Sequence, residues 1–341
     1  MSQAKKYFQL TTSFYITIIF RMISFDNMKQ HKKLFLLFLL TLCLSGFIAP
    51  VIKVILDTLT SSSSFMADLL NYKHGSYDFG RVMRRIMMAM AILLIFLMRK
   101  QLMIGSFVAL GIKPVQGWWE QLQMGFFLST GMFILYIIFL WICGTQIFQP
   151  DAKSPTEMIF QLLKILLIAG LVGCIEEILF RGFIFQSLLA DLQTVSAICI
   201  SSLFYSLLHF FKVKLLVTPG FQPFIGFIVI YQSFKDIAVN FPAILPLIIG
   251  LFLVGVVLSY AYFRTKSLYL AIGIHAGWIF LIKANKLFFD HVGMNLKWLF
   301  GDSKMITGAL GWSFLMFTLI LIRFVTKARV ACNGKDTART F

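Results

Sequence analysis

The residues most able to do chemistry in this sequence are charged side chains that interrupt an apolar run. The stretch GCIEEILFRGF, residues 173–183, contains Glu176, Glu177 and Arg181. The chain has only four glutamates, so half of them lie here. A carboxylate inside a membrane costs several kcal/mol unless it is paired, protonated or in a wet cavity. This cluster therefore needs either a structural or a chemical explanation.

Helical spacing separates the two glutamates. Glu177 and Arg181 are four residues apart, which is the spacing of an ion pair on one helix face. Glu176 is rotated by about 100° from Glu177 on an α-helix and so faces something else. A charge cluster that only ties helices together would explain the pair, but it does not need the additional carboxylate of Glu176.

Two histidines in other apolar runs are the candidate partners of Glu176. His209 ends SSLFYSLLHF, with Tyr205 one turn before it. His275 lies in AIGIHAGW, where the flanking glycines Gly273 and Gly277 allow close approach of another helix. A single histidine in an apolar span is more often a hydrogen-bonding partner between helices than a catalytic group. Three runs that each carry one costly residue favour a shared site.

A carboxylate and two imidazoles are sufficient to activate water against an amide. Glu176 would take the proton from water, one histidine would position the water, and the other would donate to the developing oxyanion. The same three residues, Glu176, His209 and His275, also form a possible zinc-ligand set. The sequence has no HExxH motif, so we expect no cofactor, with zinc as the alternative.

The elements that must position these residues are membrane helices. Hydrophobic residues make up 59% of the 341 residues and charged residues 13%, and the mean hydropathy is +0.85. Apolar runs of about 20 residues cross a bilayer as helices. We expect an all-α polytopic membrane protein with about eight transmembrane helices and the active site inside the bundle. The expected spans are residues 34–56, 83–98, 121–143, 159–180, 194–211, 243–263, 267–289 and 305–325.

The expected organisation has four parts. Residues 1–33 form a cytoplasmic or interfacial segment, with an amphipathic stretch at 7–25. Residues 34–110 hold the first two spans and their connection. Residues 111–290 form the catalytic core, with an irregular insertion at 212–242, and residues 291–341 hold the last span and a basic tail.

The net charge of +17 fits lysines and arginines that flank membrane spans. No basic run is long enough, or paired with a known module, to indicate nucleic-acid binding. The distribution of these residues favours cytoplasmic N- and C-termini. The expected partners are membrane lipid and a hydrophobic or lipidated peptide or protein substrate. The expected location is a membrane, and the bacterial inner membrane in particular.

The motifs resemble those of the CAAX protease and bacteriocin-processing family of intramembrane proteases. EEILFR, from Glu176 to Arg181, fits the family's EExxxR motif. YSLLH, from Tyr205 to His209, fits FxxxH with tyrosine in place of phenylalanine. The third motif, HxxxN or HxxxD, begins at His275. Three ordered motifs on three apolar runs make the resemblance specific.

The resemblance implies roles for these residues. Glu176 would be the general base, helped by His209, and His275 would contribute to the oxyanion hole. Glu177 and Arg181, with Tyr205 beside them, would support the site. The family includes eukaryotic endopeptidases that remove the last three residues of prenylated CaaX proteins. It also includes bacterial members linked to bacteriocin maturation or self-immunity.

One position departs from the family pattern. The asparagine or aspartate of the third motif is Ile279 here. Isoleucine donates no hydrogen bond, and losing one oxyanion donor costs a factor of ~10²–10³ in rate. Either Ser202, Ser206 or a backbone amide replaces the donor, or the enzyme is slow, or the chain is an impaired member that acts as an immunity or binding protein. A transporter with an intramembrane proton relay is less favoured, because no internal repeat is visible.

Overall fold

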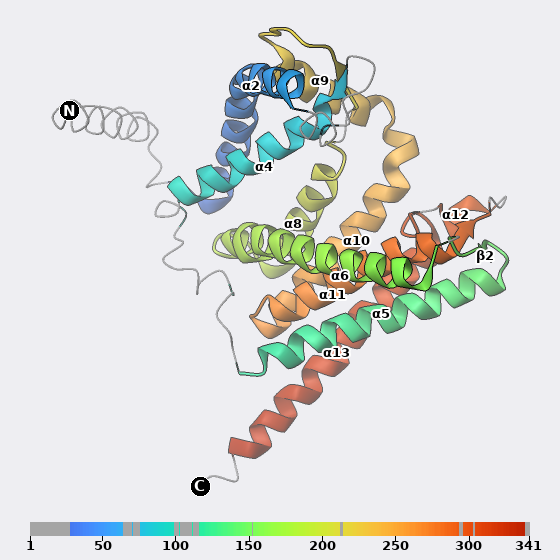
Figure 1. The fold of residues 1–341 in the computed structure, drawn as a ribbon. Coiled ribbons are helices and arrows are strands. Elements are labelled where there is room, and N and C mark those ends of the chain that lie inside the picture. Colours follow the sequence, from blue (N-terminus) through green and yellow to red (C-terminus); the bar gives the residue numbers. More distant parts are fainter. Residues whose placement is uncertain are drawn as a thin grey trace. The chain divides into compact units, whose positions relative to one another are not determined.

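The computed structural model describes residues 28–63, 70, 76–98, 102, 111, 116–151, 153–211, 214–292, 296–302 and 304–337 (Figure 1). The chain divides into two compact units, and each is described by itself. The first comprises residues 1–105 and 214–228, and the second comprises residues 106–213 and 229–341. The predicted amphipathic stretch at 7–25 lies outside the described residues.

The first unit is built on two packed helices and a short strand pair. Helix α2 (Gln30–Ser62) packs against α4 (Phe79–Leu97). Strand β1 (Tyr77–Asp78) pairs antiparallel with β3 (Leu216–Val217). Asp78 caps α4 by accepting a hydrogen bond from the backbone N–H of Gly80. Through this strand pair, part of the predicted insertion at residues 212–242 is joined to the segment between α2 and α4.

A fully buried lysine, which the sequence did not single out, fastens this unit. The Lys53 ammonium on α2 is 2.8 Å from Asp57 Oδ2 and donates to the carbonyl oxygens of Thr218 and Gly220 at 2.8 Å and 2.7 Å. The hydroxyl of Tyr77 donates to Asp57 Oδ1 at 2.9 Å. All three donor positions of the ammonium are therefore used, as a buried charge requires.

The second unit is helical, with one small strand pair, β2 (Gln146–Phe148) and β4 (Phe289–His291), which is antiparallel. Helix α6 (Pro155–Glu177) continues without a break into a π-helical stretch at Ile178–Phe185 and then into α7 (Gln186–Leu189). Its helices are α5 (Trp118–Ile142), α6 (Pro155–Glu177), α7 (Gln186–Leu189), α8 (Thr194–Leu208), α9 (Ile225–Val239, of which residues up to Ile228 belong to the first unit), α10 (Phe241–Thr265), α11 (Tyr269–Phe288), α12 (Lys297–Phe300) and α13 (Ala309–Thr337).

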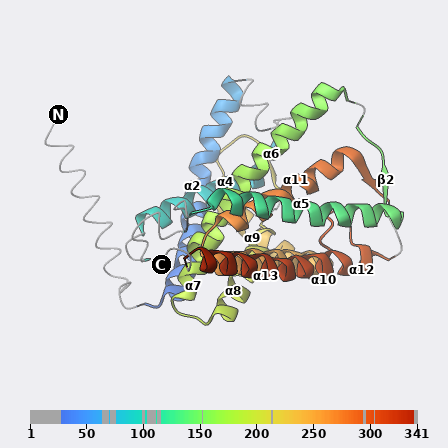
Figure 2. The same ribbon diagram turned by 90° about the horizontal axis from the view of Figure 1, so that it is seen from below.

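Helix α11 is the centre of this unit. It lies beside α5 in both views and also packs against α6 and α10 (Figure 1 and Figure 2). A Cβ atom on Gly273 would overlap the carbonyl oxygen of Leu122 on α5, and one on Gly277 would overlap the Ser129 hydroxyl. The expectation that these two glycines permit close approach of another helix is confirmed, and the partner is α5.

The all-α polytopic fold class is confirmed, whereas the count of eight spans is not. Among the described residues, five helical stretches are long and apolar enough to cross a membrane: Gln30–Ser62, Trp118–Ile142, Pro155–Leu189, Phe241–Thr265 and Ala309–Lys327. The expected spans at 83–98, 194–211 and 267–289 are helices α4, α8 and α11, which are not among the five. Helix α8 has only 15 residues, and α4 carries three arginines.

Candidate active site

The acidic pair lies where α6 changes from α-helical to π-helical geometry. The Glu177 carboxylate and the Arg181 guanidinium are 2.7 Å apart, and both side chains are almost completely inaccessible to solvent. Arg181 also donates to the carbonyl oxygen of Gly255 on α10 at 3.3 Å. Its guanidinium carbon lies 4.8 Å from the centre of the Tyr205 ring, which adds a cation–π contact. The predicted pair is present, and it links three helices.

His275 is bound to the same carboxylate. Its Nδ1 lies 2.8 Å from Glu177 Oε1, so the neutral ring carries its hydrogen on Nδ1 and donates it to Glu177. Its Nε2 then faces Glu176, whose Oε2 is 3.8 Å away. Glu177 therefore orients the histidine that was expected to act on the substrate.

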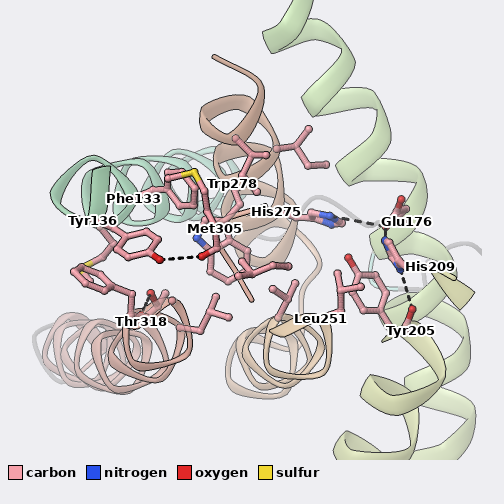
Figure 3. A pocket seen from close by; sticks show the side chains of 18 residues that line it. Phe133, Tyr136, Glu176, Tyr205, His209, Leu251, His275, Trp278, Met305 and Thr318 are labelled. Atoms are coloured by element: carbon pink, nitrogen blue, oxygen red, sulfur yellow. Dashed lines mark hydrogen bonds and ion pairs between the residues drawn. The ribbon is translucent and has the colours of Figure 1, made fainter. Parts of the chain in front are cut away.

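His209 is oriented in the same way by the backbone. It caps the C-terminus of α8, and its Nδ1 lies 2.9 Å from the carbonyl oxygen of Tyr205. A carbonyl accepts only, so the neutral ring donates from Nδ1 and presents Nε2 as an acceptor. That Nε2 is 4.0 Å from Glu176 Oε2. Both imidazoles thus direct Nε2 at the same carboxylate (Figure 3).

Glu176 differs from Glu177 in accessibility and in partners. Its side chain keeps 28% exposure, whereas that of Glu177 has none. Its Oε2 makes no hydrogen bond within the described part of the chain. The phenol of Tyr205 lies close enough to interact with this carboxylate, and the Tyr205 ring contacts the His209 ring in a tilted arrangement, with 4.5 Å between the ring centres. Glu176 is the more available of the two carboxylates for a water or a substrate.

These residues form one end of a cavity of about 180 Å³. Glu176 and His209 lie at this end, with His275 directed toward them (Figure 3). Tyr136 and Thr318 lie at the opposite end (Figure 3). The walls between are mostly apolar and come from α5, α10, α11, α13 and the residues before α13. Sequence patterns gave no indication that α5 and α13 would contribute, because their lining residues carry no reactive group.

The structure also locates the alternative oxyanion donors. Ile279 lines the cavity one turn beyond His275 and presents only hydrocarbon. Ser206 donates to the carbonyl oxygen of Ile248 at 2.8 Å. Ser202 is fully buried and packs directly against Gly255 on α10, with no room for a side chain at that glycine. Neither serine is part of the cavity wall among the residues described. The lining groups able to donate to a bound substrate are therefore the indole of Trp278, the phenol of Tyr205 and, only when doubly protonated, the imidazoles of His275 and His209.

The donor set has the chemistry of a zinc site. Both histidines present Nε2, and each anchors its Nδ1–H on a carbonyl or a carboxylate, as metal-ligating histidines do. In the arrangement of the described residues, however, no group of three His, Cys, Asp or Glu side chains is placed to hold a metal ion. The arrangement of these residues thus gives zinc no support of its own, and zinc stays the alternative expectation from the residue types.

The chain matches a known protein family. Residues 158–281 match the family model described as type II CAAX prenyl endopeptidase, Rce1-like. The matched segment contains Glu176, Glu177, Arg181, His209 and His275. No curated protein and no solved structure matches the chain. The resemblance drawn from the three motifs is confirmed, and the match supports a membrane peptidase.

Proposed function

We propose that this chain, whose residues 158–281 belong to the Rce1-like family of type II CAAX prenyl endopeptidases, is an intramembrane endopeptidase that uses a glutamate and two histidines to activate water. The observation that carries the proposal is the convergence of Glu176, His209 and His275 at one end of a cavity. Glu176 Oε2 lies 3.8 Å and 4.0 Å from the two Nε2 atoms, so the three groups are directed at one point.

In the proposed mechanism each group has one step. Glu176 accepts a proton from water as the water oxygen attacks the peptide carbonyl carbon. Nε2 of His209 accepts a hydrogen bond from the same water and orients its lone pair. When the tetrahedral intermediate collapses, the C–N bond breaks and the proton held by Glu176 passes to the leaving amine. Because Glu176 Oε2 has no hydrogen bond in the described structure, it can take the proton from water and give it to the amine without breaking a hydrogen bond within the protein.

His275 stabilises the oxyanion in its doubly protonated form. Because Nδ1–H is held by Glu177, Nε2 can donate only when it also carries a hydrogen. The negative charge of Glu177 complements the imidazolium, and Arg181 in turn holds Glu177. The Glu177–Arg181 pair therefore positions an oxyanion donor as well as joining helices.

Substitution of the three residues tests the proposal. We expect Glu176→Gln, His209→Ala and His275→Ala each to lower peptide cleavage by a factor of about 10²–10⁴ in purified, lipid-reconstituted protein. The exposed Glu120 at the start of α5 provides a control, and Glu120→Gln should cleave at the wild-type rate. Cleavage by Glu176→Gln at the wild-type rate would exclude this mechanism.

The proposed mechanism needs no metal. The three side chains come from separate helices and there is no HExxH motif, which favours direct activation of water by Glu176. If zinc were bound, Glu176, His209 and His275 would hold it, and it would supply a polarised water. We expect purified active protein to carry no stoichiometric zinc and to keep its activity in a chelator. Loss of activity in the chelator with recovery on adding zinc would establish the alternative.

The proposed substrate is a membrane-associated peptide or protein, either lipidated or hydrophobic. We further propose that both termini face the cytoplasm and that the protein resides in a bacterial inner membrane. Labelling of single cysteines introduced near each terminus by an impermeant reagent tests the orientation. Labelling of these cysteines in intact cells would show that the termini face outward and would contradict the proposed orientation.

One observation favours a second candidate, an impaired member that binds a peptide for immunity without cleaving it. Ile279 presents hydrocarbon to the cavity at the position where the family motif has asparagine or aspartate. In that case Glu176→Gln would leave the cellular immunity phenotype intact. Robust cleavage of any peptide by the wild-type protein removes this candidate.

A further inference from the structure

We infer that Tyr205 is a further catalytic residue, whose neutral phenol donates a hydrogen bond to the oxyanion and supplies the donor that Ile279 cannot. This inference rests on the proposed peptidase function, because it concerns the tetrahedral intermediate of that reaction. Tyr205 keeps its proton throughout, so the step needs no additional group to accept or return a proton.

The phenol of Tyr205 reaches the reactive end of the cavity from α8. Tyr205 lines the cavity, as Glu176 and His209 do. Figure 3 shows its hydroxyl pointing from α8 toward His275 and Glu176. The phenol lies close enough to the Glu176 carboxylate to interact with it. The hydroxyl is therefore at the same end of the cavity as the groups that would activate water.

Contacts on several sides hold the Tyr205 ring in place. The guanidinium carbon of Arg181 lies 4.8 Å from the ring centre, and the ring of Phe180 packs edge-on at 4.9 Å between centres. The ring centres of His209 and His275 are 4.5 Å and 6.3 Å away. Tyr205 as a whole is only 2% exposed. A donor fixed in this way needs little rearrangement when charge develops on the substrate.

Other neutral donors of the cavity wall are less well placed. Tyr136 and Thr318 each donate to a backbone carbonyl oxygen, at 3.1 Å and 2.9 Å. Both lie at the opposite end of the cavity from Glu176 (Figure 3). The indole of Trp278 also lines the cavity and can donate, so its substitution provides a direct comparison with that of Tyr205.

The two imidazoles donate only under a condition that Tyr205 does not need. Nδ1 of each ring is held by an oxygen acceptor, so Nε2 of His275 or His209 donates only from a doubly protonated ring. A phenol is neutral and carries its hydrogen at neutral pH. Tyr205 can therefore donate to the oxyanion whatever the protonation state of the histidines.

The order of events makes this hydrogen bond specific to the transition state. In the resting protein the Glu176 carboxylate attracts the phenol hydrogen of Tyr205. When water attacks, its oxygen bonds to the carbonyl carbon, its proton passes to Glu176, and the carbonyl π electrons move onto the substrate oxygen. Glu176 is then neutral, so the hydroxyl turns about its C–O bond toward the charged oxygen. A hydrogen bond gained at this point raises kcat rather than substrate binding.

Tyr205→Phe removes the hydroxyl and keeps the ring contacts with Arg181 and His209. We expect kcat of the lipid-reconstituted protein to fall by a factor of about 10²–10³, with KM within about twofold and the thermal unfolding temperature unchanged. Tyr231→Phe is the matched control and should cleave like the wild type, because Tyr231 on α9 is 65% exposed and does not line the cavity. A wild-type kcat in Tyr205→Phe would overturn the inference and leave the peptidase function standing.

A double-mutant cycle with Ile279 tests whether the lost hydroxyl was the oxyanion donor. Ile279→Asn offers an amide to the cavity one turn beyond His275. We expect it to raise kcat by at least about tenfold more in the Tyr205→Phe protein than in the wild type, because the two donors serve the same oxygen. Equal gains in both backgrounds would show that the two positions act independently and would contradict the inference.

A binding measurement applies even if no peptide is cleaved. A peptide phosphinate, in which a tetrahedral anionic phosphorus group replaces the scissile amide, mimics the oxyanion, and the amide peptide of the same sequence is the reference. Tyr205→Phe should weaken phosphinate binding by at least about tenfold and amide binding by less than about twofold, since the hydrogen bond forms only to developing charge. Unchanged phosphinate binding in Tyr205→Phe, a loss confined to Trp278→Phe, or equal losses for both peptides would each exclude Tyr205 as the oxyanion donor.

Discussion

The Glu177 carboxylate lies 2.8 Å from Nδ1 of His275, although the two residues are 98 positions apart in the sequence. The same oxygen is 2.7 Å from Arg181. One carboxylate oxygen therefore contacts both the Arg181 guanidinium and the His275 imidazole. The side chain of the neighbouring Glu176 keeps 28% exposure, so the two adjacent glutamates have opposite environments.

This difference predicts opposite effects of two conservative substitutions. Glu177→Gln removes the charge that compensates a buried guanidinium, and we expect the free energy of unfolding to fall by about 3–5 kcal/mol. Glu176→Gln should change it by less than about 1 kcal/mol, because this side chain is partly exposed and Oε2 has no hydrogen bond in the described structure. Unfolding of the reconstituted proteins by denaturant measures both values. Equal losses in the two variants would contradict the distinction.

Ile279→Asn tests whether the missing motif residue limits catalysis. The new amide would face the cavity one turn beyond His275 and could donate to the oxyanion. A well-placed donor raises the rate by a factor of about 10²–10³. We expect kcat to rise within or toward that range, and Ile279→Leu, which adds no donor, should leave kcat near the wild-type value. If neither variant raises kcat, the existing donors already complete the hole.

The glycine at 273 should be intolerant of any side chain. Its absent Cβ allows α11 to touch α5 at Leu122, and an added methyl group would force apart the helices that position His275. We expect Gly273→Ala to lower thermal stability and cleavage together. Gly170→Ala on α6 is the matched control, since nothing in the described structure lies within 4 Å of a Cβ there. Equal stability of the two variants would show that the helix contact is adaptable.

Two lysine–aspartate pairs should differ in their contribution to stability. Lys53→Ala leaves Asp57 and two carbonyl oxygens without the buried ammonium, and we expect a loss of about 3–5 kcal/mol in the free energy of unfolding. Lys153→Ala removes a half-exposed pair with Asp151 and should cost less than about 1 kcal/mol. Proteolysis of the region around residues 214–228 provides a second readout, because Lys53 fastens it to α2. A Lys53→Ala protein as resistant as the wild type would contradict this role.

The sequence by itself determined the fold class, and it singled out the residues that the proposed mechanism uses. Long apolar runs indicate membrane helices because the bilayer fixes their length. The Glu177–Arg181 pair could be predicted because residues four apart meet on any helix, and the change to π-helical geometry at Ile178 did not separate them. The role of Gly273 could be predicted because only small residues permit close helix contact. These inferences depend on local, periodic geometry.

Only the tertiary structure decided which groups meet. The bond between Glu177 and His275, the exclusion of Ser202 and Ser206 from the cavity wall, and the contribution of α5 and α13 all depend on how helices distant in the sequence pack together. The Lys53 cluster was missed for the same reason, because its carbonyl partners are more than 160 residues away. Spacing along a helix fixes the direction of a side chain relative to its neighbours, whereas the partner it reaches is fixed by the packing of the whole unit.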